Sequence, residues 1–157
     1  MRLVRLALLL LLPSLAAARA ADVEFVRVWP GWRDAVSFER IAEYFGGEED
    51  NGKQVMLRTH ADARAGYYFL VRVKTRAPQP EARFELTVIQ ASTLAPKTFT
   101  FAAALPANET VFQLGLTGAD YPEGKKAPPV AWKLTLLAAN GTVLVEQKSF
   151  LWEKPAK

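Results

Sequence analysis

The sequence predicts an all-β sandwich of about seven to eight antiparallel strands with one short N-terminal helix. From Val55 onward, short runs alternate apolar and polar residues, as strands with one buried face do. Turn-forming residues, most of the ten prolines among them, separate these runs about every 10–15 positions. The chain of 157 residues contains four tryptophans, four tyrosines and nine phenylalanines, which is ample material for one core.

Residues 1–20 have the features of a cleavable export signal. Two arginines near the start precede the apolar run Leu6–Leu12, and Ala18-Arg19-Ala20 places small residues where a signal peptidase reads them. The apolar run is about half as long as a membrane-spanning helix requires. We therefore expect cleavage before Ala21, leaving a soluble periplasmic or extracellular protein without a membrane span.

Residues 21–53 are predicted to form an N-terminal extension to the sandwich domain, which covers residues 54–153. The segment Val23–Trp29 is expected to be a strand. Ser37 is placed to cap a short helix over Phe38–Phe45, where apolar residues recur at helical spacing. A further strand followed by a loop is the alternative for this segment.

Seven strands are predicted in the sandwich domain, and prolines end several of them because proline cannot donate to a β-ladder. Asn140-Gly141 lies between the last two runs and predicts a hairpin with a type I′ turn, in which both central residues have positive φ. Trp132 alternates with apolar neighbours and is expected in the core. The runs are Val55–Thr59, Tyr67–Thr75, Phe84–Ile89, Thr98–Phe101, Thr110–Thr117, Val130–Leu136 and Thr142–Trp152.

This arrangement of seven strands between Val55 and Trp152 resembles the immunoglobulin or fibronectin type III sandwich. The chain contains no cysteine, so the disulfide-bonded antibody type is excluded. Disulfides, thiol nucleophiles and cysteine-based zinc sites are excluded with it. The resemblance concerns the fold, and it implies no activity.

Few residues have the pattern that catalysis or metal binding requires. His60 is the single histidine, and no Gly-x-Ser-x-Gly turn presents a nucleophile to it. The acidic run Glu48–Gly52 lacks the ligand spacing of a calcium loop. We therefore expect no catalytic residue, metal or cofactor. A small hydrolase that uses two facing carboxylates is the enzymatic alternative.

The strongest candidates for ligand binding are three aromatic residues, Trp29, Trp32 and Tyr121. Exposed aromatic rings on one face stack on sugar rings, whereas tryptophans beside strand ends often cover the open end of a core. We expect Trp32 to cover the core in this way. Exposure of Trp29 and Trp32 on one face would instead indicate a carbohydrate-binding module.

The net charge of +4 overstates how basic the mature protein is. The first 20 residues contain three of the 20 basic residues and no acidic one, which leaves 17 basic against 16 acidic residues. A nucleic-acid partner is therefore not expected, and the remaining basic residues are interpreted as a solvated face. The expected function is that of a non-enzymatic protein-interaction or accessory module, with carbohydrate binding as the alternative. The basic residues considered are Arg58, Arg64, Arg72, Arg76, Arg83, Lys125 and Lys126.

Overall fold

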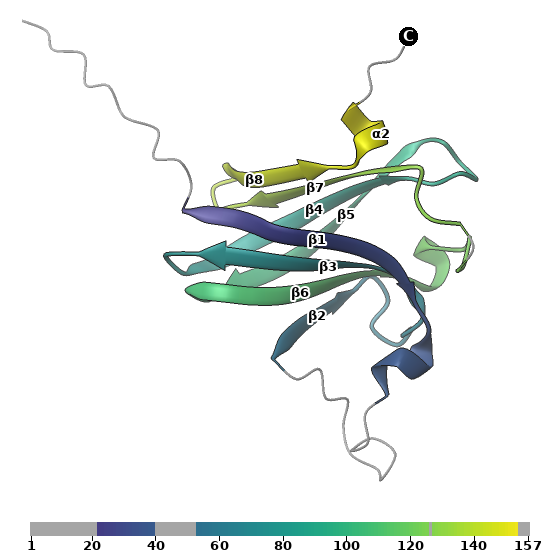
Figure 1. Cartoon of the computed structure of the whole chain (residues 1–157), viewed down its shortest axis with the longest axis horizontal. Coiled ribbons are helices and arrows are strands. Elements are labelled where there is room, and N and C mark those ends of the chain that lie inside the picture. The colour runs from purple at the N-terminus through teal and green to yellow at the C-terminus, as the bar shows by residue number, and fades with distance from the viewer. Residues whose placement is uncertain (1–21, 40–52, 126, 154–157) are drawn as a thin grey trace, which may run out of the picture.

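The computed structural model describes residues 22–39, 53–125 and 127–153, which form two packed sheets of four strands each (Figure 1). The strands are β1 (Val23–Arg33), β2 (Gln54–Arg58), β3 (Gly66–Thr75), β4 (Gln79–Ile89), β5 (Pro96–Leu105), β6 (Asn108–Thr117), β7 (Ala131–Leu137) and β8 (Val143–Lys148). The first sheet has the order β1-β3-β6-β2, and the second has the order β5-β4-β7-β8. The all-β sandwich and the upper strand count of eight are thus confirmed, but the strands are not all antiparallel, because β2 pairs parallel to β6.

Helical structure in the described residues is limited to three short segments: η1 (Ala35–Phe38), η2 (Gly118–Asp120) and α2 (Phe150–Glu153). The helix predicted over Phe38–Phe45 does not begin where expected. Phe38 ends the 3-10 helix η1 and the next residue, Glu39, is extended, so Ser37 lies inside a turn rather than at a helix cap. The rest of that predicted helix and the export signal lie outside the described residues.

Strand β1, which the sequence assigned to an N-terminal extension, is a full member of the first sheet. It pairs with β3 from Val23 to Arg33 and continues past Pro30, because an edge strand tolerates proline. A β-bulge at Val26 inserts one extra residue between Phe25 and Arg27. The bulge shifts the alternation by one residue. Each residue after it therefore faces the side of the sheet opposite to the one it would face in an uninterrupted strand.

The core lies between the two sheets, where the inward positions of the alternating strands meet. Trp132 lies on this inner side as predicted, with its ring edge-on to Phe69 at a centroid distance of 5.5 Å, and it is half-buried. The inward side chains with no exposed surface are Phe69, Val71, Phe84, Leu86, Val88, Phe112, Leu114, Leu116, Leu134 and Leu136.

The predicted hairpin joins β7 to β8, but its turn is not type I′. Gly141 has φ of +82°, whereas Asn140 does not have positive φ. The Gly141 N–H donates to the Ala138 carbonyl, and the Ala138 N–H donates to the Thr142 carbonyl, both at 2.9 Å. This pattern is that of a type I turn followed by a left-handed glycine, which a three-residue loop favours over the mirror-image turn.

Candidate functional site

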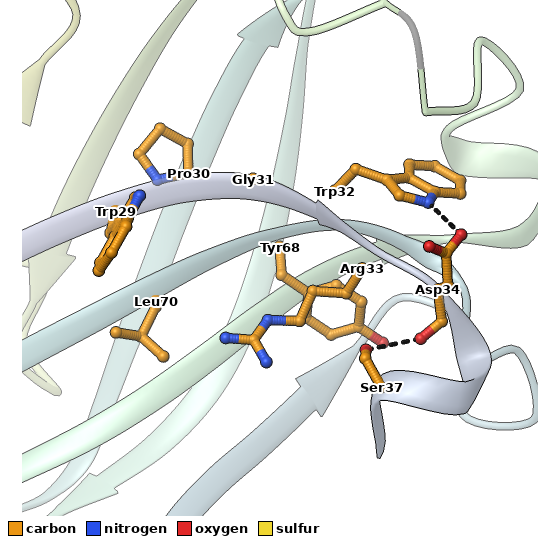
Figure 2. A pocket seen from close by; sticks show the side chains of 9 residues that line it. All are labelled: Trp29, Pro30, Gly31, Trp32, Arg33, Asp34, Ser37, Tyr68 and Leu70. Atoms are coloured by element: carbon orange, nitrogen blue, oxygen red, sulfur yellow. Dashed lines mark hydrogen bonds between the residues drawn. The ribbon is translucent and has the colours of Figure 1, made fainter. Parts of the chain in front are cut away.

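A groove lies on the outer face of the first sheet, where β1 runs beside β3 and leads into η1 (Figure 2). It encloses about 400 Å³. Its lining includes Trp29, Gly31 and Arg33 from β1, and Tyr68 and Leu70 from β3. We call this surface the outer groove.

The groove exists because of the bulge at Val26. After the bulge, Arg27, Trp29, Gly31 and Arg33 occupy alternate positions on the outer side of β1, opposite Leu70 and its neighbours on β3. Figure 2 shows the side chains of Trp29 and Arg33 on one side of the β1 ribbon and those of Pro30 and Trp32 on the other. An edge strand thereby presents one aromatic ring and two cations outward.

Tyr68 forms a rigid floor between two glycines. In the sheet register it lies opposite Gly31 on β1 and Gly115 on β6. Its ring lies over Gly115, where a Cβ atom would come within 2.4 Å of the ring. A Cβ atom on Gly31 would meet no atom within 4 Å. The open space of the groove is thus the space that a side chain at position 31 would occupy.

Hydrogen bonds and ring packing hold Tyr68 in this position. Its hydroxyl accepts from Nε of Arg58 at 2.8 Å and donates to the carbonyl of Arg64 at 2.7 Å. The ring of Phe38, at the end of η1, packs on it with a centroid distance of 4.8 Å. Tyr68 is only 1% exposed as a result. Such a floor needs no rearrangement to receive a ligand.

Trp29 is the exposed aromatic residue of the groove, with 59% of its surface accessible. It lies directly across from Leu70 in the β1–β3 ladder. The guanidinium of Arg27 lies over its ring at 4.7 Å from the centroid. Trp29 is therefore the most accessible aromatic side chain among the residues that line the groove.

The carboxylate that lines the groove is already paired. Asp34 accepts from the Trp32 indole at 2.8 Å and from the Lys125 ammonium at 3.2 Å. The Trp32 hydrogen bond, and then Lys125, lower the pKa of Asp34. Asp34 therefore stays ionised and contributes little net charge to the groove.

The three predicted binding residues do not form one platform. Both tryptophans line the outer groove, but Trp32 also packs against the core and contacts Tyr121, with ring centroids 6.4 Å apart. Tyr121 is buried against Tyr67 at 5.1 Å, its hydroxyl donates to the Ala127 carbonyl, and burial raises its pKa. Trp32 and Tyr121 thus belong to the end of the core.

Several groove residues were not among those predicted from the sequence. Their signal was present as period-two spacing on both sides of Trp29, but it becomes visible only when the strand is continued through Pro30 to its end. Among the lining residues, the sequence analysis did not single out Arg33 or Leu70, and it did not single out Arg27, whose guanidinium lies over the Trp29 ring.

A polar cluster joins loops at one end of the sandwich. The His60 Nε2 atom lies 3.1 Å from Asp120, and the Lys97 ammonium lies 2.7 Å from the other oxygen of that carboxylate. The hydrogen bond from Lys97 is the main reason why the pKa of Asp120 is lowered. Within the described part of the chain, no serine hydroxyl contacts His60. This cluster fastens loops together at that end of the sandwich.

No protein-family model matches the sequence, and neither does any curated protein. Across residues 22–39, 53–125 and 127–153, no group of three or more potential ligands is arranged to hold a metal ion. The acidic run Glu48–Gly52 lies outside these residues. The described helices are all too short or too polar to cross a membrane.

Proposed function

We propose that this protein is an exported, non-catalytic binding module that holds a segment of a protein partner in its outer groove. The observation that carries this proposal is the exposed Trp29 beside an open cavity with a rigid Tyr68 floor. Tryptophan, tyrosine and arginine supply most of the binding energy at protein interfaces. The outer groove, of about 400 Å³, presents Trp29 and Arg33 from these residue types, and the buried Tyr68 supports it from beneath.

The chemistry of the groove supports binding rather than catalysis. Hydrolysis by paired carboxylates requires two acids that face each other across a cleft. Asp34 is the single carboxylate among the groove-lining residues, and its oxygens are engaged by Trp32 and Lys125. His60, the only imidazole in the sequence, belongs to the loop cluster and not to the groove lining.

Carbohydrate binding is the second candidate, and the exposed ring of Trp29 favours it. Sugar-binding surfaces of this type use two or three coplanar rings. Here Arg27 covers the Trp29 ring at 4.7 Å, and the ring of Trp32, which also lines the groove, packs against Tyr121. We therefore rank a protein partner first.

We also infer that the sandwich is of the immunoglobulin type. In that type one sheet has the order A-B-E-D and the other contains C-F-G. The first sheet fits this order if β1, β3 and β6 are A, B and E, and the second fits if β4, β7 and β8 are C, F and G. Strand β5 then lies beside C, as C′ does. The departure is β2, which occupies the D position but pairs parallel to β6.

Two variants test the proposed function from opposite directions. Trp29→Ala removes the anchor, and Gly31→Leu places a side chain in the cavity at a position where its Cβ atom would meet no atom within 4 Å. Peptides of about ten residues, selected from a random displayed library against the mature protein, should bind both variants at least about tenfold more weakly. Phe150→Ala, which changes an aromatic residue that is 80% exposed in α2, is the matched control and should leave binding unchanged.

The outcomes distinguish the candidates. Selected peptides that bind Trp29→Ala and Gly31→Leu as well as the wild type would refute the proposal. If no peptide is selected, but binding to a neutral polysaccharide is lost in Trp29→Ala, the carbohydrate candidate replaces it. Thermal melts of both variants should match the wild type, because neither change touches the core.

A further inference from the structure

We infer that the segment held in the outer groove is acidic and extended, with carboxylates that reach Arg27 and Arg33 and an apolar side chain between them. This inference rests on the proposed function, and it names the chemical class of the partner. It follows from three features of the groove: its unpaired cations, their orientation and their spacing.

The first feature is that two cations at the groove have no acidic partner among the described residues. On the same sheet, Arg72 pairs with Glu109 at 3.4 Å and Lys74 pairs with Glu24 at 3.8 Å. Within the part of the chain that the structure describes, neither Arg27 nor Arg33 has an acidic side chain within salt-bridge distance. As far as the described residues show, Arg27 beside the groove and Arg33 in its lining are therefore available to the carboxylates of a bound segment.

The second feature is that both guanidinium groups are already oriented. Arg27 lies over the Trp29 ring at 4.7 Å, and Arg33 lies over the Phe38 ring at 5.8 Å. Stacking occupies the flat face of a guanidinium and leaves its N–H edge available for a bidentate contact with a carboxylate. Figure 2 shows the Arg33 guanidinium extending from β1 into the space near Leu70. Orientation before binding lowers the entropy that binding costs.

The third feature is spacing, which excludes a small anion as the ligand. Arg27 and Arg33 are six residues apart on one face of a strand, so their backbone positions are separated by about 20 Å. A single phosphate or carboxylate cannot reach both. An extended polypeptide covers that span with about six residues and places its central side chains against Trp29 and the space over Gly31.

Asp34 sets the limit of the site on the η1 side. Its charge is compensated by Lys125 at 3.2 Å, but a carboxylate placed beside it would still be repelled. We therefore expect the acidic residue at this end to contact Arg33 rather than the first turn of η1.

The experiment uses pairs of peptides taken from the selection described above. In each pair one peptide keeps its Asp and Glu residues and the other has Asn and Gln in their places. The acidic member should bind the wild type at least about tenfold more tightly, and its affinity should fall between about 50 and 500 mM salt. Arg27→Gln and Arg33→Gln should each remove much of this difference. Arg76→Gln, at the far end of the same sheet and paired with Asp22, should not.

The proposal and the function on which it rests fail in different ways. If binding depends on Trp29 but is equal for both members of each pair, the inference that the partner is acidic is wrong. The proposal of a binding module is then unaffected. Absence of any Trp29-dependent peptide overturns the module itself. Binding to an acidic polysaccharide that requires both arginines, in the absence of peptide binding, overturns the protein partner. Exchange of both arginines for glutamate should reverse the preference toward lysine-containing peptides.

Discussion

At the scale of single residues, the two glycines that flank Tyr68 have different requirements. Gly115 lies beneath the Tyr68 ring, so a methyl group there must displace a side chain that is 1% exposed. We predict that Gly115→Ala lowers the free energy of unfolding by about 1–3 kcal/mol. Gly31→Ala meets open space and should raise it by up to about 1 kcal/mol, because alanine loses less entropy in a strand. Urea unfolding of the two variants measures the difference, and equal midpoints would contradict the account of the floor.

The two tryptophans of β1 should separate stability from binding. Trp32 contacts Tyr121 and donates to Asp34, so Trp32→Ala should lower the free energy of unfolding by about 2–3 kcal/mol. Trp29→Ala should change it by less than about 0.5 kcal/mol, because that side chain is 59% exposed. Chemical denaturation followed by circular dichroism checks both values. A large loss of stability in Trp29→Ala would show that this residue is structural.

Residue-level prediction from the sequence succeeded where alternation was uninterrupted and failed where it was not. Trp132 lies on the inner face as its apolar neighbours indicated, and Gly141 has the expected positive φ. The outward direction of Trp29 depends on the bulge at Val26. A bulge cannot be recognised in a single sequence, because the type of the extra residue is not distinctive. Its effect is to shift the inward and outward alternation of side chains by one residue.

At the scale of elements, the turn between β7 and β8 depends on one backbone conformation. Gly141 has φ of +82°, which a β-branched residue adopts only with strain. Gly141→Val should therefore lower the free energy of unfolding by about 1–3 kcal/mol. Gly141→Asn should cost less, because asparagine tolerates this region better. The urea midpoints of the two variants measure this difference. An unchanged midpoint for Gly141→Val would show that residue 141 is not the positive-φ position of the turn.

The loop cluster around Asp120 should make stability depend on pH. The Lys97 hydrogen bond lowers the pKa of Asp120 in the folded protein. The resulting stabilisation is therefore complete above the unfolded pKa of about 4 and is lost as the pH falls through the folded pKa. Asp120→Asn should cost about 1 kcal/mol at pH 7 and progressively less toward pH 2.

Urea unfolding across that pH range tests the Asp120 prediction. Glu109→Gln is the control, because its pair with Arg72 is about half exposed and should contribute less than about 0.5 kcal/mol. A difference between wild type and Asp120→Asn that does not change with pH would exclude ionisation of Asp120 as its origin.

The positions of the strands were predicted from the sequence more accurately than the residues at which they end. Period-two runs located all eight strands. Strand β8 stops at Lys148, because Ser149 instead donates its N–H to the Trp132 carbonyl and accepts from the Trp132 N–H through its hydroxyl. The segment after β1 formed a 3-10 turn because the Ser37 hydroxyl and N–H both bond to the Asp34 carbonyl. Such local hydrogen bonds compete with helix and strand without altering the hydrophobic period.

At the scale of the whole molecule, export is a prediction about where the chain begins. If residues 1–20 are an export signal, the secreted protein begins at Ala21. The charged start, the apolar run and the small residues before Ala21 are the reasons. Intact-mass measurement of protein recovered from outside the cytoplasm checks it. Recovery of a chain that still begins at Met1 would refute cleavage, and replacing Ala18 and Ala20 with bulky residues should block it.

The strand orders of the two sheets have a consequence for how the molecule folds. In the second sheet, β4 with β5 and β7 with β8 are neighbours in the chain as well as in space. In the first sheet no two adjacent strands are consecutive in sequence, so every ladder closes a long loop. Because closing a longer loop costs more entropy, we expect the two hairpins of the second sheet to form before the ladders of the first sheet. The outer groove is built entirely on that late sheet and its extension into η1, so an unfinished chain has no groove to offer a partner.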